Sequence, residues 1–87
     1  MPSLGGVGNA IAGGRVVTGS QSVTVNDLPV VIIGSNVAGH GRDEHSGPVM
    51  VTGSQSVTAG DIGVCVYGNH ASCGHAMTCN SNVEVGL

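Results

Sequence analysis

Hydrophobic positions along this chain occur in short runs of Val and Ile, interspersed with Thr and separated by glycine-bearing segments. Residues 16–18 and 23–25 have the Val/Thr composition of half-buried strands. The continuous apolar runs at residues 30–33 and 64–67 are typical of short strands that are buried on both faces. The pattern therefore predicts pairs of short strands repeated along the chain.

Turn-forming residues separate these runs. Residues 26–29 and 59–63 combine Asn, Asp, Gly and Pro, and we expect both segments to be turns, with Pro29 ending strand pairing in the first. No window longer than one turn has apolar residues at helical spacing. The fold class that we predict is all-β, with many tight turns.

The eight letters VTGSQSVT occur at residues 17–24 and again at residues 51–58. A repeat of this length in a chain of 87 residues indicates one small β-unit used several times. Similar Gly- and Asn-rich openings at Gly8, Gly34 and Gly68 extend the repeat to a third copy.

These openings predict one domain, residues 1–87, with three pseudo-equivalent units at about residues 8–33, 34–67 and 68–87. The third unit ends in a strand expected at residues 83–85. The second unit is longer by eight residues, and the extra residues fall at 40–47, where one strand should connect to the next.

Composition limits what such a chain can do. The core must be built from Val, Ile, Leu and Ala, because there is no Phe or Trp and only one Tyr. A net charge of −3 with two basic residues argues against nucleic-acid binding, which requires Lys and Arg to neutralise phosphates. No run reaches the roughly 18 apolar residues of a membrane span, and the N-terminus lacks the pattern of a signal peptide.

A core this thin usually needs a further stabilising element, and the odd count of three cysteines favours a metal over a set of disulfides. The histidines and cysteines gather in two windows, the insertion at residues 40–47 and the opening of the third unit. Because these windows are equivalent in neighbouring units, we expect them to meet at one end of the fold. Zinc takes four nitrogen or sulfur ligands. The ligand set that we predict is His40, His45, Cys73 and His75.

Other His and Cys residues are weaker candidates. His70 and Cys79 could replace one of the four ligands, although the repeat equivalents of Cys79 are glycines at turns. Cys65 lies in an apolar run and is expected to be a small buried hydrophobic residue. Segment 42–44, Arg-Asp-Glu, is expected to be a solvated rim of the loop, and no further acid–base pair is available for catalysis.

The order of these elements resembles PAAR-repeat proteins. The unit of that family reads roughly T-G-S-x-x-V-x-V-N-G-x-P-A-A-R-x-G-D, and residues 18–35 read TGSQSVTVNDLPVVIIGS. The resemblance covers about residues 8–86. The arginine of the motif that names the family is missing both times, since PVVI stands at residues 29–32 and GVCV at residues 63–66. Ser72-Cys73-Gly74 matches the cysteine motif of the family.

The resemblance implies a cone-shaped fold of three pseudo-three-fold units with one structural zinc near the apex. It also implies a mechanical function without enzymatic activity. Such proteins cap the central spike of type VI secretion systems or contractile phage tails and sharpen it for membrane piercing. The implied partner is a trimeric β-helical spike protein, VgrG-like or from a phage, that binds one copy per trimer, and the target membrane is contacted transiently.

The implied location is the bacterial cytoplasm during assembly on the spike, followed by ejection, or the tail tip of a virion. The secretion-system and phage origins remain open, and so do zinc and iron as the metal. The main alternative function is a small metal-dependent hydrolase or metal-binding protein that uses the His/Cys cluster. A third interpretation is a free-standing, antifreeze-like or adhesive β-solenoid.

Overall fold

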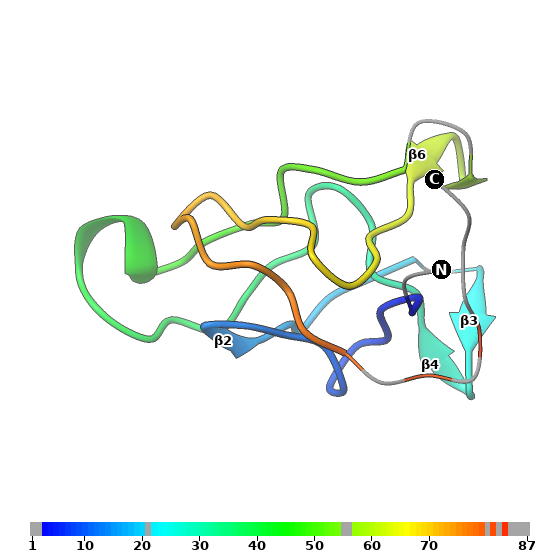
Figure 1. The fold of residues 1–87 in the computed structure, drawn as a ribbon, viewed down its shortest axis with the longest axis horizontal. Helices are drawn as coiled ribbons and strands as arrows, with labels where there is room; N and C mark the ends of the chain where they lie inside the picture. The colour runs from blue at the N-terminus through cyan, green and yellow to red at the C-terminus, as the bar shows by residue number, and fades with distance from the viewer. Residues whose placement is uncertain (1–2, 21, 55–56, 80, 82, 84–87) are drawn as a thin grey trace.

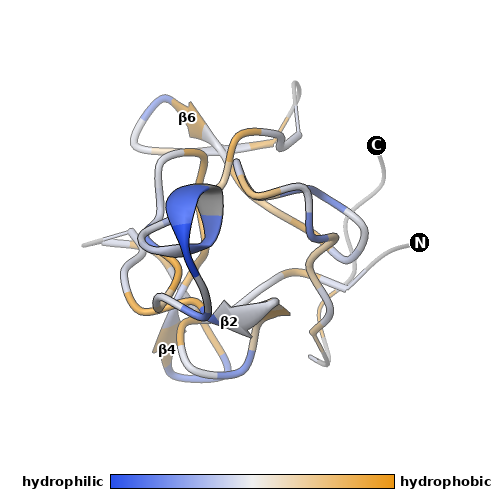
Figure 2. Ribbon diagram, turned by 90° about the vertical axis from the view of Figure 1, so that its left-hand side faces the viewer, coloured by the Kyte–Doolittle hydropathy of each residue, from blue (hydrophilic) through white to orange (hydrophobic). Residues whose placement is uncertain are grey.

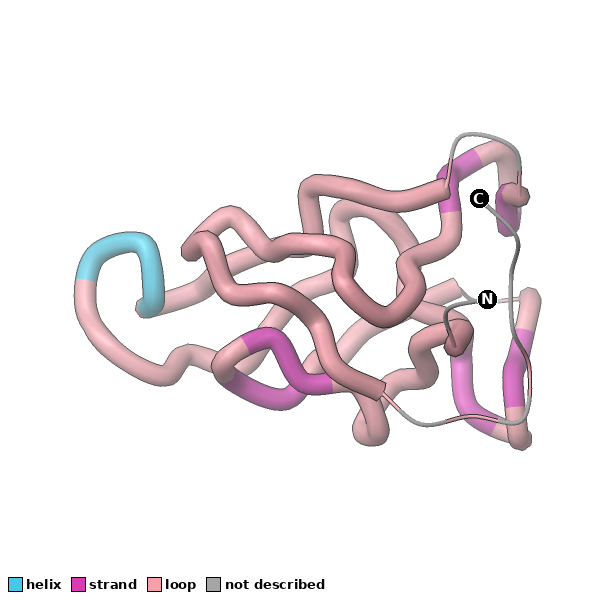
Figure 3. The backbone as a smooth tube through the Cα atoms, in the orientation of Figure 1, coloured by secondary structure: helices cyan, strands magenta, loops and turns pink. Residues whose placement is uncertain are grey.

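The structure is a computed structural model that describes residues 3–20, 22–54, 57–79, 81 and 83. Most of the described chain is loop, with short strands and one turn of 3-10 helix (Figure 3). The elements in chain order are β1 (Ile11–Ala12), β2 (Gly14–Arg15), β3 (Thr24–Val25), β4 (Leu28–Pro29), η1 (Asp43–His45), β5 (Thr58–Ala59) and β6 (Ile62–Gly63). The prediction of a non-helical, all-β fold is confirmed in coarse terms. Residues 16–18, 30–33 and 64–67, which were expected as strands, contribute only isolated bridges, at Val16, Val30, Ile32, Val64 and Val66.

The strands form three two-stranded antiparallel sheets, β1–β2, β3–β4 and β5–β6. The molecule measures 32 × 22 × 22 Å, and η1 lies at one end of the long axis (Figure 1). Hairpins β3–β4 and β5–β6 lie at the opposite end, called the hairpin end from here on. Viewed along this axis, the hydrophilic η1 stands in front, with β4 and β6 behind it (Figure 2).

The two hairpins use the same turn. Asn26 and Asp27 have φ of 50° and 65°, and Gly60 and Asp61 have φ of 60° and 67°. Positive φ at both central residues is the geometry of a type I′ turn, whose twist matches that of the flanking strands. Asn, Asp and Gly tolerate this geometry best, so the local sequence accounts for both hairpins.

The turns are shorter than the sequence predicted. Leu28 and Pro29 belong to β4, and Pro29 pairs with Thr24. The expectation that Pro29 ends strand pairing was therefore wrong. A proline is tolerated here because a two-stranded sheet has only edge strands, where the missing N–H can face away from the partner.

A ring of backbone hydrogen bonds joins three segments in the interior. Gly5 N–H donates to Cys65 O (3.0 Å), Cys65 N–H donates to Val31 O (2.8 Å), and Val31 N–H donates to Gly5 O (2.9 Å). All three residues are buried. A side chain at Gly5 would lie 2.5 Å from Met77 Cε, so a larger residue here would require the Met77 side chain to move.

The N-terminal segment completes the third unit. Leu4 N–H donates to Val83 O, as Val30 and Val64 donate to the oxygens of Val23 and Val57. The sequence had given residues 3–7 no role and had ended the third unit at Leu87. Residues 84 and 85 of the strand predicted at 83–85 lie outside the described residues, and the exact unit boundaries stay a prediction.

The side chains of the repeated letters hold the turns. Thr18 and Thr52 accept, through Oγ1, the N–H groups of Asn36 and His70, each at 2.7 Å. The equivalent serines, Ser20 and Ser54, are buried and accept through Oγ the N–H groups of Val23 (3.0 Å) and Val57 (2.9 Å). The serines bond within a turn and the threonines bond residues 18 positions ahead, so these hydroxyls make the repeat a structural scaffold.

Two apolar clusters fill the described interior. The cluster nearer the hairpins contains Leu4, Val25, Val30, Ala59, Val64 and Val66. The other contains Ala10, Ala12, Val16, Val31, Val37, Met50, Cys65, Ala71, Cys73 and Met77. Of the apolar run at residues 30–33, Val30 and Val31 are fully buried but Ile33 is exposed, so the run is buried only in part.

Cys65 is a buried hydrophobic residue, as predicted, and burial raises the pKa of its thiol to about 12. Because the folded protein retains this proton while the unfolded chain loses it above about pH 9, the free energy of unfolding should fall as pH rises from about 9 toward 12. The expected slope reaches about 1.4 kcal/mol per pH unit. Urea unfolding between pH 8 and 10.5 measures it, and C65V should lose this component. An equal slope in C65V would contradict the assignment.

Candidate metal centre

His40, His45, Cys73 and His75 form one group at the η1 end of the molecule, with their ligand atoms all within 4.8 Å of one another. The structure thus brings together the four residues that the sequence singled out. His45 is the last residue of η1, and His40 lies just before this turn. Cys73 and His75 come from the third unit. This group could hold a metal ion.

The insertion loop curls so that both of its histidines face inward. His40 N–H donates to His45 O at 2.8 Å, and this hydrogen bond closes the loop across η1. Asp43 begins η1 with a φ of 55°, a left-handed conformation that Asp accepts more readily than most residues. The eight extra residues of the second unit therefore serve to present two imidazoles.

The spacing of the donor atoms fits a tetrahedral ion. His40 Nε2 lies 3.1 Å from His45 Nδ1 and 3.1 Å from His75 Nδ1, and Cys73 Sγ lies 3.7 Å and 3.4 Å from the same His40 and His75 atoms. With metal–nitrogen bonds of about 2.0–2.1 Å and metal–sulfur bonds of about 2.3 Å, a tetrahedron has N···N edges of about 3.3 Å and N···S edges of about 3.6 Å. These four separations match the corresponding edges within a few tenths of an ångström.

The surroundings of His40 select the tautomer that such a site needs. His40 Nδ1 lies 3.1 Å from the carbonyl oxygen of Ala38, which only an N–H can satisfy. This leaves the Nε2 lone pair free to face the other donors. In metal-binding histidines, a hydrogen bond donated by the ring nitrogen that does not bind the metal fixes the orientation of the ring. Cys73 is buried and His75 is exposed, so the group spans the boundary between core and solvent.

The first unit contributes space and no ligand. A side chain on Gly13 would collide with His75 Nδ1 and would lie 2.5 Å from His40 Nε2. Gly13 also has a φ of 84°, which side-chain-bearing residues rarely adopt. The sequence alone gave Gly13 no role. The repeat could have indicated one, because Gly13 in the first unit is equivalent to Cys73, a predicted metal ligand, in the third.

We expect Gly13→Ala to abolish metal binding, because the new methyl group would occupy the place where the nitrogen donors converge. Gly8→Ala is the matched control: Gly8 has a φ of 85° but no atom lies within 4 Å of its added Cβ. Both variants carry the same backbone strain, of order 1–3 kcal/mol. Elemental analysis of the two proteins should give metal in the control alone. Equal metal contents would refute the role of Gly13.

The two reserve ligands lie elsewhere. His70 is exposed, and its N–H group bonds to Thr52 Oγ1. Cys79 packs against the core with its Sγ 3.4 Å from Ser3 O, and burial raises the pKa of its thiol against a smaller lowering by a backbone hydrogen bond involving Tyr67. Neither belongs to the group around His40.

The rim of the loop is charged. Arg42 and Asp43 are exposed, as predicted, and the side chain of Glu44 lies outside what the structure describes. No carboxylate oxygen belongs to the four-residue group. A site of three imidazoles and one thiolate favours a borderline-soft ion over the hard cations that prefer oxygen ligands.

Compared with models of known protein families and with curated proteins, the chain has no match. The family membership suggested by the motifs therefore stays a prediction. Within the described part of the chain, no helix has the length and apolarity needed to cross a bilayer.

Proposed function

We propose that this protein is a PAAR-like spike tip, in which one chain caps a trimeric β-helical spike and sharpens it for membrane piercing. One observation carries the proposal. Val23, Val57 and Val83 accept equivalent backbone hydrogen bonds and are similarly exposed, at 38%, 38% and 43%. Apolar side chains left open at three matching positions suit a three-fold partner.

The arrangement of units explains why one chain would suffice. A symmetric trimer presents three identical surfaces at its end, and a single chain can complement all three only if it repeats its own contacts. The hydrogen-bond ring through Gly5, Val31 and Cys65 supports such a pseudo-three-fold axis. The two-stranded hairpins β3–β4 and β5–β6 leave strand edges through which an added β-structure can bind.

The metal group at the other end fits a rigid apex. We propose one structural zinc per chain, held by the three histidines and Cys73. Zinc bound there would tie the insertion loop to the third unit, beyond the apolar clusters, and its binding free energy would also be folding free energy. The proposed role is mechanical and not enzymatic, with assembly on the spike in the bacterial cytoplasm before ejection, or placement on a virion tail.

A metal-dependent hydrolase fits the geometry less well. Catalytic zinc sites keep one coordination position open for water or substrate. Here three imidazoles and one thiolate could supply all four ligands, and the group found among the described side chains includes no carboxylate. These features favour a closed structural site.

The test is to mix the protein with the trimeric β-helical spikes of its own source genome and to weigh the complexes by native mass spectrometry. We expect one chain per trimer. Val57→Lys should weaken binding at least about tenfold, because a charge would enter the apolar contact. Val51→Lys is the control, since Val51 is also exposed (47%) but its N–H bonds to His70 O, away from the hairpins. Three chains per trimer, or no complex, would overturn the proposal.

A further inference from the structure

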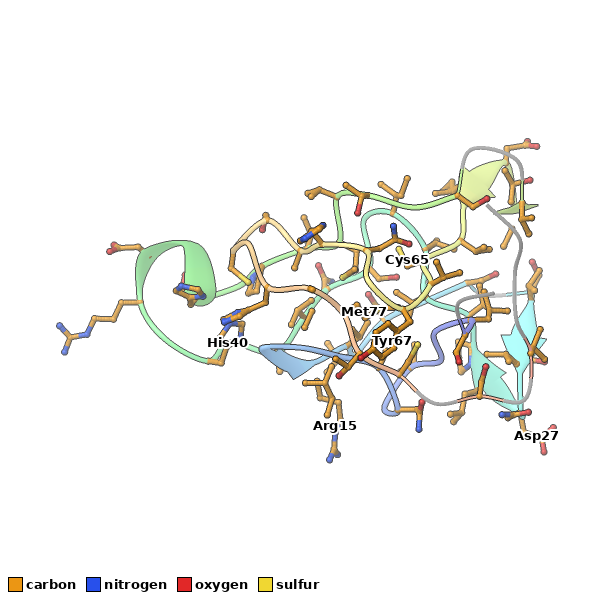
Figure 4. All side chains as sticks on the ribbon, viewed as in Figure 1. Arg15, Asp27, His40, Cys65, Tyr67 and Met77 are labelled. Carbon is orange, nitrogen blue, oxygen red and sulfur yellow. The ribbon has the colours of Figure 1, made fainter. Side chains whose placement is uncertain are left out.

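The hairpin end carries charge of one sign among the described residues. Asp27 and Asp61 occupy equivalent positions at the tips of the β3–β4 and β5–β6 turns, and both are exposed. The only two basic residues of the chain are Arg15 and Arg42. Arg42 precedes η1 at the far end of the molecule, and Arg15 points outward from the flank (Figure 4).

The turn geometry does not require this charge. A type I′ turn needs residues that accept positive φ, and Asn or Gly serves at least as well as Asp. The preceding turn positions are in fact the uncharged Asn26 and Gly60. Placing a carboxylate at the same point of both hairpins is therefore a separate feature of the surface, beside the apolar contact at Val23 and Val57.

We infer that the end of the partner that receives this protein has an apolar centre surrounded by basic side chains, one from each protomer of the trimer. This inference rests on the proposed function. Asp27 and Asp61 would each face one of these basic groups at the rim of the contact. Rim charges of this kind act mainly by steering the encounter and by rejecting wrong partners. The aspartates would thus select spikes with a basic rim and disfavour spikes with an acidic one.

Two engineered versions of one trimeric β-helical spike test this inference, with Lys or Glu at the same rim position of every protomer. We expect the Lys-rim spike to bind this protein about 3- to 10-fold more tightly than the Glu-rim spike at low salt, since exposed ion pairs contribute modestly. The preference should shrink at high salt.

The variant D27N/D61N removes both charges while keeping side chains that accept positive φ, and it should bind the two spikes equally. Asp43→Asn removes an exposed charge at the η1 end and should leave the preference unchanged. A preference that survives in D27N/D61N, or none in the wild type, would overturn the inference and leave the capping function standing. If neither spike binds, the capping function falls as well.

Discussion

Removing the metal with a chelator is expected to lower the melting temperature by about 15–25 °C. Binding through His40, His45, Cys73 and His75 would cross-link positions 33 residues apart in the chain. By the chain-entropy estimate used for covalent cross-links, closing such a loop stabilises the fold by about 3–4 kcal/mol. In a domain of this size, each kcal/mol corresponds to about 4–8 °C.

Calorimetry of the metal-loaded and chelated protein measures this shift, and elemental analysis counts about one metal per chain. Cys73→Ser should reproduce the chelated state, because a serine hydroxyl is a poor substitute for a thiolate ligand. His70→Ala is the control, as His70 is exposed and lies outside the group. A folded preparation that contains no metal and melts at the same temperature with and without chelator would contradict the site.

Deleting residues 1–7 is expected to abolish cooperative unfolding. The deletion removes Leu4 from the apolar cluster near the hairpins and breaks the hydrogen-bond ring at Gly5. The buried N–H group of Val31 and the buried C=O group of Cys65 would lose their partners, at about 1–3 kcal/mol each. Together with the lost apolar burial of Leu4, this cost is comparable with the whole free energy of unfolding of a small domain. Near-ultraviolet circular dichroism and urea unfolding report the loss.

A permuted variant, with the N-terminal segment moved to the C-terminus, tests whether the segment stabilises the fold through its pairings or whether any shortening of the N-terminus destabilises it. If residues 3–7 follow Leu87 through a short glycine linker, the segment can still pair beside Val83, where Leu4 lies in the native chain. We expect this permuted protein to fold and to unfold cooperatively. A permuted protein as unfolded as the deletion variant would show that the segment acts through its position in the chain and not through these pairings.

The local pattern was sufficient for the features that depend on neighbouring residues. The repeat VTGSQSVT indicated turns, and Ser20 and Ser54 hold them through hydrogen bonds to residues three positions ahead. The dipeptides at residues 26–27 and 60–61 adopt the positive φ angles that turns of this kind need. The apolar run at residues 64–67 predicted burial, which the structure confirms for Val64, Cys65 and Val66 but not for Tyr67, which is exposed.

The sequence by itself also determined which residues of two distant segments would meet, because aligning the repeats put His40 and Cys73 at neighbouring places. Only the tertiary structure decided how the fold closes. The pairing of Leu4 with Val83 and the space left by Gly13 beside His40 and His75 involve segments that are far apart in the chain. Such contacts depend on how segments distant in the chain pack together, and no local pattern of residues encodes that packing.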